Sequence, residues 1–477
     1  SDEQTKGAET GPQKAPWAEL FREGRGFYTV LLILGTALHA LQILVIAIIM
    51  PTVVGDIGGA NYYTWVAMVY TIGSIIGAAS VGPVWARLGR RKGYTFSGIA
   101  LLLATAGCAI APDMGVLIVL RGVQGFAGGM VTGGGMALVS GLFDERLRTR
   151  VLALNQGTWM IAQLMGPLVG GVFAEIGWWR GSFWAMVPLI LIFSIVAWVK
   201  LPVTMEGEKA ATRPGRFPVV RLTMLASGVF CVALAGPVDH LVLRILLIIA
   251  AVALIWLTFA RDRVAENRLF PSGILSPRSP VGIALWILFL AGGVQTSVNI
   301  FLPLLLQVVH GVTPLFISFV SIVISFGWTV GTFGVSGWSG DKERLALVTG
   351  PIFMFAGLVI ITVTAELPQL AVLTLGALIL GFGIGVHNVH LLARTMAAAV
   401  KGEERITASA LPSIRSLGTA FGAALAGMLS NIGGLGDATD PAAVGAAVTF
   451  IYGVELVPLA LAVLFMFWLV RLTRYPN

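Results

Sequence analysis

Three ionisable residues lie deep inside apolar stretches of this sequence, and they are its first candidates for chemistry. They are Glu455, Arg121 and Arg415. Charged side chains are costly inside a bilayer and usually mark the path of an ion or a substrate. Because burial disfavours a charged carboxylate, Glu455 could take up and release a proton near neutral pH. The alternative is a structural carboxylate paired with Arg415 or with a polar neighbour.

Uncharged polar residues recur at helical spacing within other apolar stretches, so several of them share one face of a helix. Together with nearby aromatic residues they predict a mostly apolar cavity that carries few charges. Each side chain taken alone is more often a packing residue or an interhelical hydrogen-bond partner. Such a cavity suits a bulky amphipathic or lipid-like substrate better than a sugar. The predicted cavity residues are His39, Gln42, Trp65, Tyr70, Trp159, Gln163, Gln295, Asn299, Trp328, His387, Asn388 and Tyr452.

The composition indicates what kind of elements must position these residues. Of the 477 residues, 57% are hydrophobic and only 11% are charged, whereas a soluble domain carries about a quarter charged residues. The net charge of +8 does not indicate a nucleic-acid partner, because the cations occur in short clusters between apolar segments. The composition therefore predicts a membrane protein.

Fourteen apolar segments are long enough to cross a bilayer, which takes about 20 residues each. Each segment must be helical, because the lipid offers no partner for backbone polar groups. The sequence thus predicts an all-α polytopic membrane protein with fourteen spans. The predicted spans are 28–50, 63–84, 94–111, 115–138, 151–173, 181–201, 219–238, 241–260, 281–306, 314–335, 346–365, 369–392, 407–430 and 444–470.

The distribution of Lys and Arg predicts that both chain ends are cytoplasmic, since cytoplasmic loops carry the excess of these residues. All but four of the 31 cations then fall in inner segments, and the exceptions are Arg121, Arg180, Arg244 and Arg415. A short stretch before the first span, Pro16–Phe27, could lie on the membrane surface.

The longest inner stretches flank the seventh and eighth spans, which leaves six spans before this pair and six after it. Paired bundles of this kind are typical of secondary transporters, with the substrate site between the halves. The predicted parts are a cytoplasmic N-terminal segment (1–27), a six-helix bundle (28–201), a linker with two extra transmembrane helices (202–280), a second six-helix bundle (281–470) and a cytoplasmic tail (471–477).

Several classes of chemistry have no support in the sequence. Walker A, HExxH and GxSxG patterns are absent, the five histidines are scattered, and both cysteines lie in apolar runs. We therefore expect neither an enzyme nor a bound cofactor or metal. The expected partners are a hydrophobic or amphipathic small molecule or lipid, membrane lipids and possible protons, and we expect a monomer.

Two glycine-containing stretches could control movement. In GPVWARLGRRKGY (82–94) four cations crowd between two spans, and they anchor this loop in the cytoplasm and could clamp helix ends. In the fifth span, glycines and a proline let a neighbouring backbone approach closely, as ordinary packing or as a seal against leak. The predicted gating residues are Gly82, Arg87, Gly89, Arg90, Arg91, Gly166, Pro167, Gly170 and Gly171.

These stretches, in their order, resemble the major facilitator superfamily, and specifically its fourteen-helix drug:proton antiporter family. Residues 82–94 resemble the motif between helices two and three, RGVQG (121–125) the helix-four motif and GPLVGG (166–171) the antiporter motif of helix five. SALPSIRSLGTAFGAAL (409–425) resembles helix thirteen. The resemblance implies two six-helix bundles plus two inserted helices, alternating access, and proton-driven export of amphipathic compounds across the bacterial inner membrane.

Two departures from that family pattern bear on the mechanism. Gln42 occupies the helix-one position where the family has an acid, and Ala86 occupies the acid position of the loop motif. In the family the arginine matching Arg121 is implied to help proton transfer by biasing a nearby acid, but here it could equally bond backbone carbonyls of helix one. We therefore expect either proton coupling through Glu455 or a lipid exporter or flippase with atypical or no proton coupling.

The loss of an acid at Ala86 further predicts a weaker or rebuilt inner gate. Its cations would then bond carbonyls at helix C-termini, or an acid such as Asp144 or Glu145.

Overall fold

The computed structural model describes residues 16–59, 62, 65–203, 216–236, 238–312, 314–435 and 440–473. The ends 1–15 and 474–477 and residues 204–215 of the predicted linker lie outside the described residues, as does the side chain of Pro167. Within the described ranges the chain forms helices and no strand. The predicted all-helical fold class is confirmed for this part of the chain.

The first bundle is preceded by a single 3-10 turn, η1 (Trp17–Phe21). Its helices are α1 (Arg25–Ile57), α2 (Trp65–Ala79), α3 (Val81–Ala109), α4 (Met114–Leu142), α5 (Glu145–Glu175), α6 (Arg180–Trp184) and α7 (Val187–Lys200). Helix α4 packs against α2, α3 and α1, and therefore lies at the centre of this bundle.

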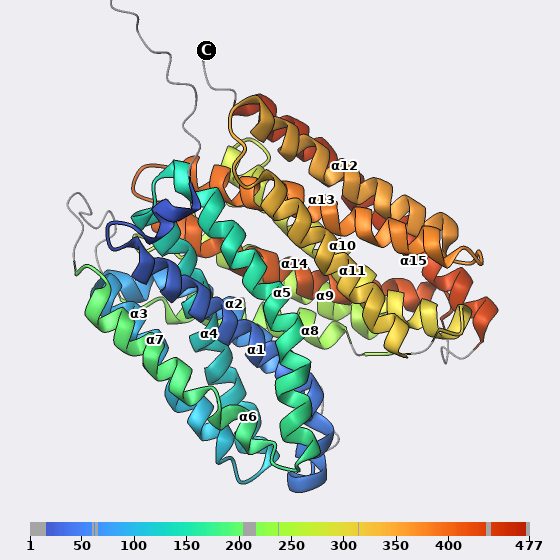
Figure 1. The fold of residues 1–477 in the computed structure, drawn as a ribbon, viewed down its shortest axis with the longest axis horizontal. Coiled ribbons are helices and arrows are strands. Elements are labelled where there is room, and N and C mark those ends of the chain that lie inside the picture. Colours follow the sequence, from blue (N-terminus) through green and yellow to red (C-terminus); the bar gives the residue numbers. More distant parts are fainter. Residues whose placement is uncertain are drawn as a thin grey trace, which may run out of the picture.

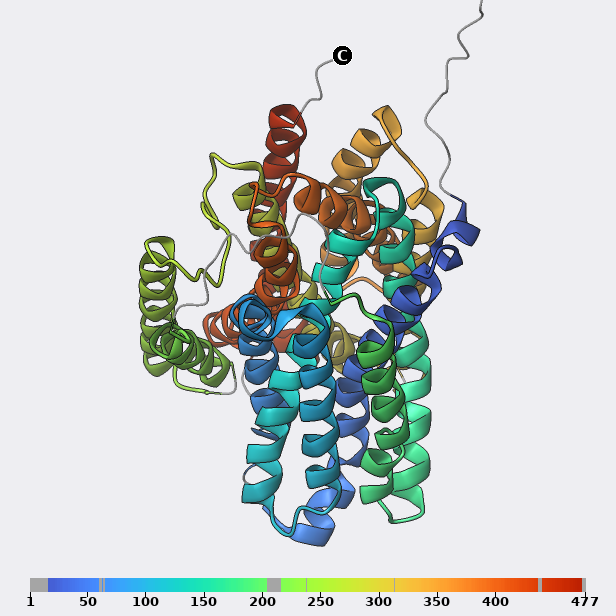
Figure 2. The ribbon, with the colours of Figure 1, turned by 90° about the vertical axis from the view of Figure 1, so that its left-hand side faces the viewer.

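The second bundle follows an inserted helical pair, α8 (Val219–Ala235) and α9 (Leu241–Arg263). Its helices are α10 (Pro280–Leu304), α11 (Pro314–Val335), α12 (Asp341–Thr364), α13 (Leu370–Ala397), α14 (Glu404–Ile432) and α15 (Pro441–Leu472), and a π-helical turn, Leu305–Val309, extends α10. The inserted helices pack against each other and against α14, and they stand to one side of both bundles (Figure 2).

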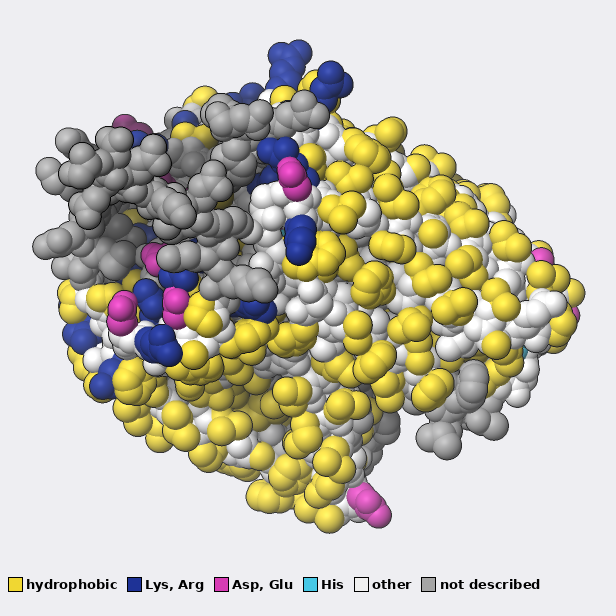
Figure 3. All heavy atoms as spheres, turned by 45° about the horizontal axis from the view of Figure 1, so that its top comes forward, with side chains coloured by type: hydrophobic (Ala, Val, Ile, Leu, Met, Phe, Trp, Pro, Cys, Tyr) yellow, Lys and Arg dark blue, Asp and Glu magenta, His cyan; other side chains and the backbone are white. Residues whose placement is uncertain are grey.

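Helices overlap all fourteen predicted spans. By length and composition, nine helical segments in the described ranges could each cross a membrane, or ten if α2 and α3, which meet at a bend of 67°, form one span. The number of crossings stays a prediction. Hydrophobic side chains cover much of the surface, while Lys and Arg gather toward one end (Figure 3).

The stretch 82–94 differs from the expected loop. It is part of α3 and is helical except at Gly89, whose φ of 82° interrupts the helix. Glycine adopts this left-handed conformation without the steric cost that a Cβ would bring. The cations on either side of Gly89 are thus carried on two pieces of helix, 81–88 and 90–109, and not on a loop.

The two bundles meet at the end where α1 begins and α15 ends, and they diverge toward the other end (Figure 1). At the meeting end, Ser413 of α14 donates to the carbonyl oxygen of Ile75 in α2 at 3.1 Å, and Thr329 of α11 lies 2.9 Å from the sulfur of Met160 in α5. Later in α5, Gly166 and Gly170 pack on α1 instead. The halves are therefore closed at one end and apart at the other.

Candidate functional site

Glu455 lies in the middle of α15 and is buried, with 1% of its surface exposed. Its Oε1 accepts a hydrogen bond of 2.6 Å from the hydroxyl of Ser297 on α10. The described residues include one other fully buried acid, Asp262, which forms an ion pair with Arg221 and accepts two backbone N–H bonds. Glu455 makes no ion pair within the described ranges, so its neighbour is a hydroxyl and not Arg415.

Arg415 on α14 is the centre of a polar cluster in the second bundle. Its guanidinium donates to Gln295 Oε1 at 2.6 Å and to Asn388 Oδ1 at 3.4 Å, and lies 5.3 Å from the ring centroid of Trp328. His387, next to Asn388, is also buried and its Nδ1 lies 2.7 Å from the carbonyl oxygen of Gly383. The structure thus brings together five of the residues that the sequence singled out.

Arg121 on α4 is the matching buried cation of the first bundle and has no exposed surface. It donates to the carbonyl oxygens of Val66 at 3.2 Å and Gln42 at 3.3 Å, and to Gln124 Oε1 at 2.8 Å. The ring of Tyr70 lies 4.4 Å from its guanidinium carbon, within the range of a cation–π contact. This geometry favours a role in which Arg121 bonds backbone carbonyls, one of α1 and one of α2.

Three further predicted residues lie beside Arg121. His39 Nδ1 and the Tyr70 hydroxyl are 2.8 Å apart, and the ring of Trp159 meets His39 edge-on with centroids 5.9 Å apart. His39 is 8% exposed. The first bundle therefore holds a hydrogen-bonded His–Tyr pair next to a buried cation.

Five predicted cavity residues join neither cluster. The Gln42 side chain contacts the sulfur of Met186 at 3.2 Å, Trp65 packs on Phe230 of the inserted helix α8, and the Tyr452 hydroxyl donates to the carbonyl oxygen of Val298. The other two are Asn299, which is exposed, and Gln163, which accepts a hydrogen bond from Ser325 of α11 across the two bundles.

The glycines of α5 allow α1 to approach closely. A Cβ added at Gly166 would lie 2.8 Å from the Cβ of Leu44, and one at Gly170 would lie 2.9 Å from the Cβ of Ile48, while one at Gly171 would meet open space. Gly166 and Gly170 thus allow close packing of α1 on α5 within the first bundle.

The cations of residues 82–94 contact helix ends and aromatic rings. Arg91 donates to the carbonyl oxygens of Leu201 at 3.0 Å and Val199 at 3.4 Å, at the C-terminus of α7. This is the arrangement predicted for a cation at a helix C-terminus. Arg87 lies over the ring of Phe217 at 5.8 Å, and Arg90 is 3% exposed. A Cβ at Gly82 would lie 2.8 Å from Ile406 of α14, so this stretch also touches the second bundle.

Sequence reasoning missed a contact between the bundles that involves η1. The Arg150 guanidinium carbon lies 4.4 Å from the ring centroid of Trp17, and its Nη1 donates to Ser336 at 3.1 Å. The rings of Trp17 and Phe333 of α11 are tilted to each other, with centroids 5.6 Å apart. The only sequence signal was the amphipathic character of Pro16–Phe27, which points to a surface and not to this partner.

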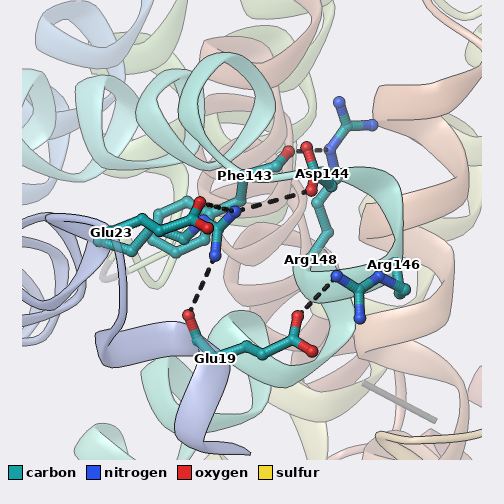
Figure 4. Close-up of polar contacts among 7 residues, drawn as sticks. Glu19, Glu23, Phe143, Asp144, Arg146 and Arg148 are labelled. Carbon is teal, nitrogen blue, oxygen red and sulfur yellow. Dashed lines mark hydrogen bonds and ion pairs between the residues drawn. The ribbon is translucent and has the colours of Figure 1, made fainter. Parts of the chain in front are cut away.

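Ion pairs fasten η1 to the start of α5. Glu19 accepts a hydrogen bond of 2.6 Å from Arg146, and Arg25 reaches both Glu23 and Asp144, at 3.2 and 3.9 Å (Figure 4). The hydrogen bond from Arg146 lowers the pKa of the Glu19 carboxyl. These contacts hold Trp17 at the closed end of the molecule.

Among the described residues, no group of three His, Cys, Asp or Glu side chains could hold a metal ion. The side chains of Arg121, Arg415 and Glu455 are instead arranged for hydrogen bonding.

Comparison with known proteins assigns the fold to a family. The Major Facilitator Superfamily profile matches residues 32–423. A protein of Mycobacterium tuberculosis named "Probable multidrug-efflux transporter" is 31% identical over 437 residues, which are 89% of this chain and 91% of that protein. "Multidrug resistance protein 3" of Bacillus subtilis is 24% identical and covers 84% of this chain and 78% of its own length.

Solved structures share the same arrangement of helices. The human organic anion transporter MFSD10 superimposes with a TM-score of 0.65 over 92% of this chain and 99% of its own. A proton:xylose symporter gives a TM-score of 0.63 over 93% of this chain and 95% of its own. Both are 16% identical to this chain, so this likeness concerns the fold alone.

Proposed function

The chain belongs to the major facilitator superfamily, a family of membrane transporters and not of enzymes, and on that premise we propose that it exports amphipathic small molecules by alternating access. Relatives named for multidrug efflux support this substrate class, and two of those relatives are bacterial, which supports a place in the bacterial inner membrane. Fourteen spans with both ends in the cytoplasm agree with the charge distribution.

In this proposal the two halves are the moving parts. The bundles meet at the end where α1 begins, and there Arg150 of α5 contacts both Trp17 of η1 and Ser336, which follows α11. If this end is cytoplasmic, the molecule is in its outward-open conformation. Export then requires the opposite state, in which these contacts separate and the outer ends of the helices close.

The observation that carries the coupling proposal is the burial of Glu455 with a serine hydroxyl as its partner and no ion pair among the described residues. A buried carboxylate without a cation is costly, and the group neutralises instead. Glu455 therefore holds a proton while buried and releases it in a conformation that admits water or a cationic substrate. This exchange would couple export to the proton gradient.

A lipid exporter or flippase of the same fold, without proton coupling, is the second candidate. It is favoured by the first bundle, where Gln42 stands at the acid position of helix one and Arg121 donates to backbone carbonyls and not to an acid. In that case Glu455 would be a structural carboxyl.

Ethidium transport distinguishes the two candidate functions. It is measured in proteoliposomes that contain the full chain, with and without an imposed pH gradient. We expect the gradient to accelerate ethidium transport by the wild type about tenfold or more, and the Glu455→Gln variant to be no faster with the gradient than without it. Glu366→Gln, which changes an exposed acid after α12, is the matched control and should behave as wild type.

Glu455→Asp retains the acid and should retain gradient dependence, which separates the loss of a proton site from a disturbed helix. Equal acceleration of wild type and Glu455→Gln would refute coupling through Glu455. Gradient-independent export by the wild type would favour the second candidate.

A further inference from the structure

A pocket of about 290 Å³ lies between the inserted helix α9 and helices α10, α14 and α15 of the second bundle. Its volume is close to the lower end of small-molecule sites, about 300 Å³. The walls are apolar and include Ile245, Phe289 and Phe421, and Glu455 is the one lining residue with a charged side chain. Ile249 at its rim is 59% exposed on the outer surface of α9, so the pocket borders the region that lipid would occupy.

Close packing of α10 on α14 makes the floor of this pocket. A Cβ at Gly422 would lie 2.5 Å from the Cα of Gly293, and a Cβ at Gly418 would lie 2.3 Å from the carbonyl oxygen of Phe289. The rings of Phe289 and Phe421 stand beside this floor with centroids 5.6 Å apart. Helix α9 packs on α8 and α14. The pocket is the space between α9 and the helices α10 and α15.

The one carboxyl of this pocket has no ion-pair partner within the described residues. Glu455 accepts a hydrogen bond from Ser297 through Oε1, and among the described residues no Lys or Arg of the surrounding helices forms an ion pair with it. Arg415 on α14 is bonded to Gln295 and Asn388, and Arg244 on α9 is bonded to the Ala235 carbonyl oxygen and to Asn431. An apolar pocket with one unpaired carboxyl complements a molecule that has an apolar body and one basic nitrogen.

We propose that this pocket binds an amphipathic amine that enters from the bilayer. Its apolar part lies against Phe289, Phe421 and Ile249, and its protonated nitrogen donates a hydrogen bond to Glu455. The inference rests on the proposed export function, because it names the substrate class and the place where substrate and proton compete for one carboxyl. A lipid acyl chain would contact the same apolar walls, but it has no group that could donate a hydrogen bond to Glu455.

The test is photo-crosslinking on the full chain in phosphatidylcholine nanodiscs, with no gradient. Two probes carry the same benzophenone on a twelve-carbon chain, one a dodecylamine and the other a dodecanol. We expect the amine to label peptides of α9, α10, α14 and α15, and labelling to fall about tenfold in Glu455→Gln, the size of effect lost with one charged hydrogen bond. The alcohol should label wild type and Glu455→Gln equally and weakly.

A second pair of variants tests the pocket without changing Glu455, in case Glu455→Gln is unstable. Ile249→Trp places a large ring at the pocket mouth and should block the amine, whereas Val457→Trp, on a 69% exposed lipid-facing position of α15, should not. Equal labelling by amine and alcohol, or amine labelling that survives both pocket variants, would overturn the pocket as an amine site and indicate a lipid chain. Pocket labelling combined with gradient-independent ethidium export would overturn the proposed coupling and leave the pocket intact.

Discussion

The two bundles hold their buried cations in different ways. In the first bundle Arg121 is fully buried and is bonded to two backbone carbonyls and to Gln124. In the second bundle Arg415 is partly buried and is bonded to the side-chain amides of Gln295 and Asn388. Backbone carbonyls are fixed by their helices, whereas amide side chains can rotate.

The bundles also differ in their acids. Glu455 is buried in the middle of a helix of the second bundle, while Asp56 and Asp113, acids of the first bundle, lie at helix ends. This contrast indicates a division of labour in which the first bundle is a rigid frame and the second carries the groups that change charge and partner. Matched substitutions in the two bundles test this difference.

The largest effect on stability is expected for Arg121→Met. The substitution leaves Gln124 and the two carbonyl oxygens buried without their donor, and breaking a buried charged network costs about 3 kcal/mol or more. We expect a marked fall in the thermal unfolding temperature of the protein in detergent. An unfolding temperature within a degree or two of wild type would show that Arg121 is not a structural cation.

Arg415→Met is the matched change in the second bundle. It should lower the stability of the protein less than Arg121→Met does, and it should lower the transport rate. Gln295 and Asn388 can bond each other or water once the guanidinium is gone, so we expect a loss of about 1 kcal/mol. Ethidium transport by reconstituted protein should nevertheless fall about tenfold. The proposed difference between the bundles is wrong if Arg415→Met has the same unfolding temperature as Arg121→Met and its folded fraction transports ethidium at the wild-type rate.

The smallest effect is expected at η1, where the first bundle touches the second. Because Arg146 lowers the pKa of Glu19 in the folded protein, this ion pair stabilises η1 above the unfolded pKa of about 4.3 and is lost as the pH falls through the lowered value. Hydrogen exchange of residues 17–21 should be faster in Glu19→Gln than in wild type at pH 7, and the difference should disappear once the pH has fallen below the lowered pKa of Glu19. A difference that persists in acid would assign the effect to something other than the ion pair.

The positions of the helices and of the two buried arginines could be predicted from the sequence, because long apolar runs must be helical in lipid and a cation inside one needs acceptors. Their partners could not. His39 and Gln42 share a helix face by spacing, but His39 meets Tyr70 and Gln42 meets Met186, since the face is wide enough to touch two helices. The contact of Trp17 with Phe333 depends on how the bundles close and leaves no trace in either segment alone.

The central claim is that the charge change of transport occurs at Glu455 in the second bundle. Proton release measured with a pH indicator dye, when ethidium binds to purified protein in weakly buffered detergent, tests it most directly. The account predicts about one proton released per bound ethidium in the wild type, release of similar size in the control Glu366→Gln, and none in Glu455→Gln. Undiminished release from a Glu455→Gln protein that still binds ethidium would contradict it.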